Sequence, residues 1–225
     1  MTRQISLPFA ILSTIFCWGF IVDGFLELKI LDIFGFSATA GLLVITLIYI
    51  VNDCLVEVYG YKLARFVVWL TFISNIIVIL LLQLACNIPS PEFWDGEEHF
   101  QFIFGLAPRI TIASMIAFVF GSMTNAYVMS KMKVKYEGKY FKTRAFVSTV
   151  FGEFVDSLTF FTIAFYGLIP NIEILSLIFT QACVKIMCET LILPITAKIV
   201  KMIKKYDNID IYDKNISYNI LSIKV

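Results

Sequence analysis

The sequence predicts an all-α, polytopic membrane protein with six transmembrane helices and both chain ends in the cytoplasm. First, 59% of the 225 residues are hydrophobic and 16% are charged, whereas soluble domains are about 45–50% apolar and about 25% charged. Second, apolar stretches recur at about the 20-residue length that crosses a bilayer. Third, the basic residues gather in alternate connections, as they do in proteins with a fixed membrane orientation.

The expected helices cover residues 6–26, 34–58, 66–86, 107–130, 145–168 and 172–200. Residues 1–225 form one domain, because the tail from Lys201 is too short for a second one. The first stretch follows Arg3 as a signal peptide would. However, residues 22–25 do not form a small-x-small cleavage site, so we expect a retained helix.

Charge in the connections sets the expected orientation. Residues 131–144 contain six basic residues and one acidic residue, and the tail region adds Lys198, Lys201, Lys204 and Lys205. Residues 92–98 contain four acidic residues. Basic segments stay in the cytoplasm, so we expect residues 87–107 and the link at Pro170 to face outward. The basic segment can also touch anionic headgroups, which agrees with this orientation.

Several function classes lack support in the sequence. The cysteines, Cys17, Cys54, Cys86, Cys183 and Cys188, form no CxxC pair, and His99 is the single histidine. We therefore expect no metal and no other cofactor. No HExxH, GxSxG or Walker motif is present, so an enzyme is disfavoured and any ATP hydrolysis would need a partner chain. The net charge of +1 does not indicate nucleic-acid binding, and none is expected.

Charged residues inside the predicted helices are the candidates for function. A carboxylate at the centre of a membrane costs about 2.5–3.5 kcal/mol on insertion scales. Asp53 and Glu57 are four residues apart, and Glu153 and Asp156 are three apart, so each pair shares one helix face. The candidate substrate-binding residues are Asn52, Asp53, Glu57, Arg109, Asn125, Glu153, Asp156, Gln181, Lys185 and Glu189.

Structural interpretations of these residues stay open. Lys185 and Glu189 are spaced for an ion pair within one helix. Asp53 and Glu57 lie near a helix end, where water could solvate them. Arg109 could be a helix-start charge or a headgroup anchor. For Gly41, Gly121 and Gly152, close helix packing is the expected role.

Four motifs resemble the queuosine-precursor transporters, which are also grouped as vitamin-uptake transporters. They are Asn-Asp-x-x-x-Glu-Val-Tyr-Gly-Tyr at 52–61 followed by Ala64-Arg65, Gly-Glu-x-x-Asp at 152–156, Pro108-Arg109 with Ala113-Ser114, and Lys185-x-x-x-Glu189 with Pro194-x-Thr196. The resemblance covers roughly residues 40–200, and the four motifs stand in the family's order and on the matching helices.

The resemblance implies a multi-pass transporter of the cell inner (cytoplasmic) membrane that imports 7-deazaguanine compounds. Its implied substrates are 7-cyano-7-deazaguanine, 7-aminomethyl-7-deazaguanine or queuine, used to make queuosine in tRNA. The sequence leaves three alternatives open: a substrate-capture subunit of an energy-coupling ATPase, an intramembrane enzyme and a scaffold. It also leaves open whether the chain forms a homo-oligomer. For a stand-alone carrier, transport is expected to be equilibrative or driven by an ion gradient, and several acids near mid-membrane favour protons as the ion.

Overall fold

The computed structural model describes residues 6–26, 29–33, 36–104, 108–168, 170–214 and 216–220, and it is predominantly helical. The helices in this part of the chain are α1 (Leu7–Leu26), α2 (Leu42–Tyr59), α3 (Tyr61–Asn87), α4 (Glu97–Phe104), α5 (Pro108–Lys135), α6 (Phe141–Phe165) and α7 (Asn171–Asp207). Strands β1 (Ile30–Ile33) and β2 (Phe36–Thr39) pair antiparallel, with Ile30 opposite Thr39.

The start of the second predicted helix is wrong. Residues 36–39 form β2, and α2 begins after its N-cap residue Gly41. A short apolar run is compatible with a strand as well as with a helix, and here the preceding apolar segment 30–33 supplies the pairing partner. The sequence did not predict this hairpin or α4, because neither is long enough to cross a membrane.

Other helix ends also differ from the prediction. Gly60, at φ 84°, separates α2 from α3, so α3 begins at Tyr61 and includes Lys62 and Arg65. Helices α5, α6 and α7 likewise run into polar sequence that we had assigned to connections. Hydropathy locates the apolar centre of a helix, whereas hydrogen bonding continues the helix beyond it.

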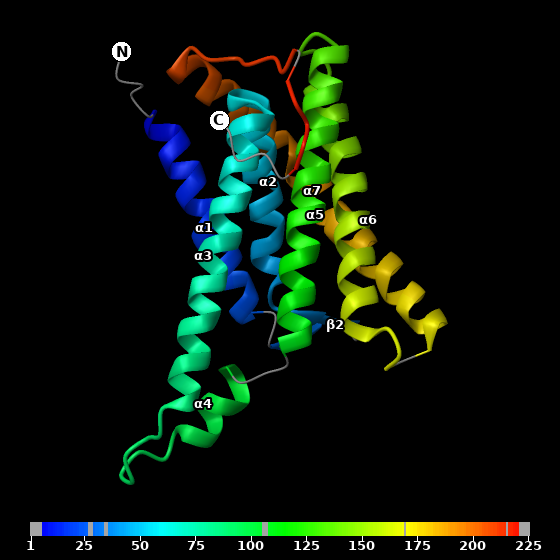
Figure 1. Cartoon of the computed structure of the whole chain (residues 1–225). Coiled ribbons are helices and arrows are strands. Elements are labelled where there is room, and N and C mark those ends of the chain that lie inside the picture. The colour runs from blue at the N-terminus through cyan, green and yellow to red at the C-terminus, as the bar shows by residue number, and fades with distance from the viewer. Residues whose placement is uncertain are drawn as a thin grey trace.

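The long helices lie side by side, with α2 packed against α1, α3, α5 and α7. Figure 1 shows the start of α1, the α2–α3 junction, the α5–α6 link and the end of α7 at one end of the bundle. The hairpin, α4 and the α6–α7 link lie toward the other end. We call the first the basic end, because it carries the basic segment 131–144.

Polar and apolar side chains are distributed as in a membrane protein. Arg65, Arg144, Asp53 and Glu153 are buried. Large apolar side chains cover the outside, and on α3 these include Leu70, Ile73, Ile77, Leu80, Leu81 and Leu84. By length and composition α1, α3, residues 112–135 of α5, and α6 can each cross a membrane. An apolar exterior of this extent requires a lipid environment, so the chain is a multi-pass membrane protein.

Two glycines allow α5 and α6 to approach closely. A Cβ at Gly121 would lie 2.6 Å from Tyr49 Oη and 2.7 Å from Asp156 Cβ. A Cβ at Gly152 would lie 2.8 Å from Asn125 Cβ. The close-packing role predicted for Gly121 and Gly152 is therefore confirmed, whereas Gly41 caps α2.

Candidate functional site

A layer of buried amides and carboxylates crosses the bundle at Asn52, Asp53 and Asn125. Asn52 Nδ2 donates to Asn125 Oδ1 at 3.1 Å and to the Ser122 carbonyl oxygen at 3.2 Å, which joins α2 to α5. Asp53 is fully buried, and neither of its carboxylate oxygens accepts a hydrogen bond from a described residue. Asn125 lies beside Asp53, but its Nδ2 is not placed for a bond of normal geometry.

The second layer joins α6 to α7 through Lys185. Lys185 Nζ lies 2.7 Å from Asp156 Oδ2 and 3.4 Å from Glu153 Oε2. Glu189 instead accepts a hydrogen bond from the Thr149 hydroxyl. The interpretation of Lys185 and Glu189 as an ion pair within one helix is therefore wrong. Two acids on one face of α6 repel each other, and the half-buried Lys185 of α7 offsets that repulsion.

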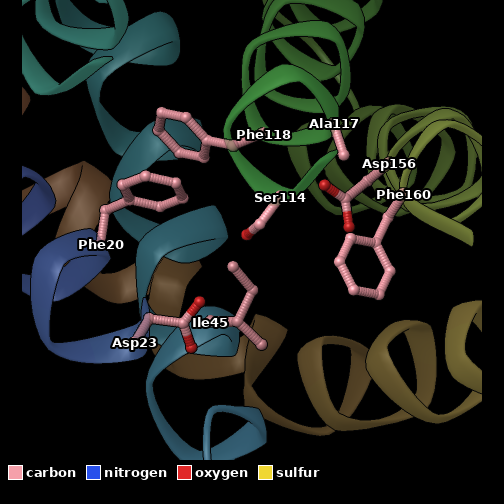
Figure 2. Close-up of a pocket in the computed structure, with 8 residues that line it drawn as sticks. All are labelled: Phe20, Asp23, Ile45, Ser114, Ala117, Phe118, Asp156 and Phe160. Carbon is pink, nitrogen blue, oxygen red and sulfur yellow. The ribbon is translucent and has the colours of Figure 1, made fainter. Parts of the chain in front are cut away.

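A small pocket lies next to this layer. Figure 2 shows Asp23 from α1 and Asp156 from α6 on opposite sides, with the Ser114 hydroxyl between them. The remaining lining residues are Phe20, Ile45, Ala117, Phe118 and Phe160. The Phe20 and Phe118 rings stack with centroids 3.7 Å apart. The cavity measures about 20 Å³, enough for roughly one water molecule.

Glu57 is at the centre of a separate ionic network toward the basic end. Arg144 donates from both terminal nitrogens to its two carboxylate oxygens, at 2.5 and 3.0 Å. Lys204 adds a third contact at 2.6 Å. Glu57 is 1% exposed and Arg144 0%, so solvation of Asp53 and Glu57 at an open helix end is excluded. Bidentate pairs of this kind fix geometry as well as charge.

The described part of the C-terminal tail, residues 208–214 and 216–220, packs over the basic end. Asp213 accepts hydrogen bonds from the Tyr61 amide at 2.7 Å and from the Ser130 hydroxyl at 2.5 Å. Arg65 donates to the carbonyl oxygens of residues 217 and 219, and Trp69 to that of residue 220. Asp210 pairs with Lys133 at 2.5 Å and Lys204 at 2.9 Å. The tail is thus a well-bonded cover of the core.

Sequence reasoning missed four residues of this core. Asp23 is the one acid of the apolar helix α1, and its place in such a sequence could have identified it. Tyr49 is buried within electrostatic reach of Asp156, Glu153, Glu189 and Asp23. Arg144 and Lys204 were counted only as topology signals. Their pairing with Glu57 is a tertiary contact between helices that no sequence spacing encodes.

Two predicted site residues are not joined to the cluster by described contacts. Gln181 lies one turn before Lys185 on α7, is half-buried, and makes no hydrogen bond within the described part of the chain. Arg109 belongs to the first turn of α5, but its side chain lies outside the described residues. The remaining eight predicted residues are buried or half-buried inside the bundle.

Comparison with known proteins places the chain in a family. A family model described as "Putative vitamin uptake transporter" matches residues 39–199. The chain belongs to this transporter family. The resemblance predicted from the four motifs is therefore confirmed, and so is the prediction that the chain is not an enzyme. The matched region includes every predicted site residue but excludes Asp23 and the tail.

Relatives of the chain carry more specific names. A "Probable queuosine precursor transporter" of Bacillus subtilis (strain 168) is 28% identical over 177 residues, covering 78% of this chain and 77% of the relative. One of Haemophilus influenzae is 28% identical over 134 residues, covering 59% and 54%. The "Queuosine precursor transporter" of Escherichia coli (strain K12) is 25% identical over 135 residues, covering 60% and 58%. No solved structure matches the chain.

Proposed function

We propose that this protein imports 7-deazaguanine precursors of queuosine across the cell inner membrane. The observation that carries the proposal is the pocket between Asp23 and Asp156, flanked by aromatic rings. The names of the relatives support this substrate class. The candidate substrates are the 7-cyano and 7-aminomethyl compounds and queuine. The lipid bilayer and the precursor are the proposed partners, and nucleic acid is not one.

The chemistry of the pocket matches a deazaguanine. Such a ring presents N1–H and an exocyclic amine on one edge, and one carboxylate accepts both in a charge-assisted, bidentate contact. Asp156 is placed for this role when the substrate displaces Lys185. Phe20, Phe118 and Phe160 supply faces for a planar ring. An aminomethyl arm carries a positive charge, for which Asp23 is the complementary acid.

Transport requires the bundle to open around this pocket. A cavity of about 20 Å³ is far below the roughly 300 Å³ at the lower end of ligand sites. The network around Glu57 and the tail seal the basic end. We infer that this conformation is occluded, and that release toward the basic end separates Arg144 and Lys204 from Glu57.

The proposed topology has six spans, α1, α2, α3, α5, α6 and α7, with both termini cytoplasmic. The basic segment 131–144 beside the tail favours that side. An impermeant thiol reagent tests it in intact cells, with single cysteines at positions 95 and 135. Labelling at 95 alone is expected. Labelling at 135 alone would reverse the orientation.

A substrate-capture subunit that works with an ATPase is the second candidate, since the chain has no Walker motif.

Uptake in cells tests the main proposal. The cells lack queuosine synthesis and salvage and are supplied with the gene and each precursor in turn. Queuosine appears in their tRNA if the protein imports that precursor. Its absence with every precursor, at normal protein level, would overturn the proposal. Liposomes containing this protein alone separate a carrier from a subunit.

A further inference from the structure

We propose that Asp53 and Glu189 form a proton-binding pair that couples uptake to the proton gradient, separate from the substrate pocket. The inference rests on the proposed transport function and adds its energy source. Asp53 is fully buried, and its two carboxylate oxygens accept no hydrogen bond from the described residues. Glu189 is 3% exposed and within electrostatic reach of Asp53.

Acceptors outnumber donors around this pair. Glu189 uses one oxygen for the Thr149 hydroxyl, and its Oε2 has no described donor. Asn52 Oδ1 is a fourth acceptor without a donor, whereas Asn125 Nδ2 is a donor without an acceptor. Buried polar groups are normally satisfied. A proton on one carboxyl group turns an acceptor oxygen into a donor. Protonation therefore reduces the excess of hydrogen-bond acceptors around Asp53 and Glu189.

Among the described residues, no cation forms an ion pair with Asp53 or Glu189. From α6, Arg144 acts on Asp53, but its terminal nitrogens are occupied by Glu57 and by the Gly138 carbonyl oxygen. Glu57 on α2 and Glu153 on α6 add negative charge beside Asp53 and Glu189 respectively. Cys54 on α2 also lies near Asp53.

In the part of the chain that the structure describes, the charged groups of the remaining elements have other partners. From α7, Lys185 pairs with Asp156 and Glu153, and Lys204 pairs with Glu57. On α3, Arg65 donates to the tail. On α1, Asp23 lies beside Tyr49, and α5 supplies the neutral Asn125.

A proton fits the pair better than a metal ion. The described residues contain no group of three or more His, Cys, Asp or Glu side chains able to hold a metal ion. In the proposed cycle, outer water transfers one proton to the pair while the bundle is open outward. The substrate binds at the pocket, the bundle opens to the cytoplasm, and the proton returns to water there. No other bond is made or broken.

Proteoliposomes test this assignment with radiolabelled 7-aminomethyl-7-deazaguanine and a pH dye trapped inside. An inward proton gradient of one pH unit can support about tenfold accumulation if one proton accompanies each substrate. The wild type is expected to accumulate substrate and to acidify the interior when substrate is added. Asp53→Asn is expected to lose both, yet still exchange labelled for unlabelled substrate, because exchange needs no net proton movement. Asp95→Asn, in an exposed loop, is the matched control and should behave as the wild type.

If Asp53→Asn does not fold, Glu189→Gln carries the same test, since its amide oxygen can still accept from Thr149. Wild-type exchange without response to the proton gradient, or accumulation driven by sodium instead, would overturn the proton pair. Gradient-driven accumulation by a folded Asp53→Asn protein would overturn it too. A wild type that neither binds nor exchanges the deazaguanine would instead contradict the proposed function.

Discussion

Lys185 on α7 forms an ion pair with Asp156 on α6, with Nζ and Oδ2 2.7 Å apart. The same ammonium group lies 3.4 Å from Glu153 Oε2, so one cation holds both acids of α6 and docks α7 against it. Asp156, which Lys185 holds through Oδ2, also lines the pocket. Lys185 is therefore a structural cation and, under the proposed function, the group that a substrate displaces.

Lys185→Met is expected to destabilise the protein, because it leaves two buried acids without their cation. Removing one partner of a buried pair costs about 3–5 kcal/mol, whereas replacing both partners is often neutral. Lys185→Met combined with Asp156→Asn should therefore recover much of the protein level but no uptake. Thermal stability in detergent and uptake measure the two effects. Uptake restored by the double variant would make the pair a structural link alone.

Arg144→Lys is expected to lower stability although it keeps the charge. A lysine cannot reproduce the two parallel contacts with Glu57. The exchange Glu57→Arg with Arg144→Glu should not rescue it, because Arg144 also donates to the carbonyl oxygens of Gly138 and Lys139. A glutamate offers those oxygens no donor. Wild-type melting temperature in the exchanged variant would contradict this account.

Gly121→Ala is expected to separate α5 from α6, because the new methyl group would overlap Tyr49 and Asp156. Overpacking of this kind typically costs about 1–3 kcal/mol. Gly24→Ala on α1 is the matched control, since no atom lies within 4 Å of its added Cβ. Melting temperatures in detergent compare the two variants. Equal values would show that the close approach of the two helices is not required.

The tail should detach in acid. Partial burial raises the pKa of Asp210, but hydrogen bonds from Lys133 and Lys204 lower it further, so the net shift is downward. A lowered pKa means that Asp210 stabilises the docked tail above about pH 4, the unfolded-state value. This contribution is lost as the pH falls through the folded-state pKa. Cleavage of the tail by an acid-stable protease should therefore be faster at low pH than at neutral pH.

Asp210→Asn provides the control for this pH dependence. It should loosen the tail at neutral pH and weaken the acid effect, because the asparagine cannot ionise. A tail equally protected at pH 3 and pH 7 in the wild type would contradict the assigned role of Asp210.

Sequence reasoning succeeded where a local pattern determines the outcome. Apolar runs located the long helices, and the four motifs identified the family. The spacing of Glu153 and Asp156 placed both acids on one face, and Lys185 then pairs with both. The hairpin at 30–39 escaped prediction because short apolar runs suit a strand as well as a helix.

Other parts of the site depend on contacts between distant segments. The sequence predicts Arg144 to be a charge in a cytoplasmic connection. In the structure it is buried against Glu57, 87 positions away in the chain. Asp213 belongs to a polar tail, yet it accepts from the Tyr61 amide. Neither partner can be derived from local spacing, because the fold of the whole bundle brings them together.

Competitive binding to the purified protein tests the central claim most directly. Adenine presents an acceptor at N1, where a 7-deazaguanine presents a donor, so Asp156 would face a second electronegative group. An unpaired buried charge of this kind costs about 3 kcal/mol, which corresponds to roughly a hundredfold in affinity. We predict that the protein binds 7-aminomethyl-7-deazaguanine at least about a hundredfold more tightly than adenine, and that Asp156→Asn removes this preference. Equal affinity for the two compounds in the wild type would contradict the carboxylate recognition on which the account depends.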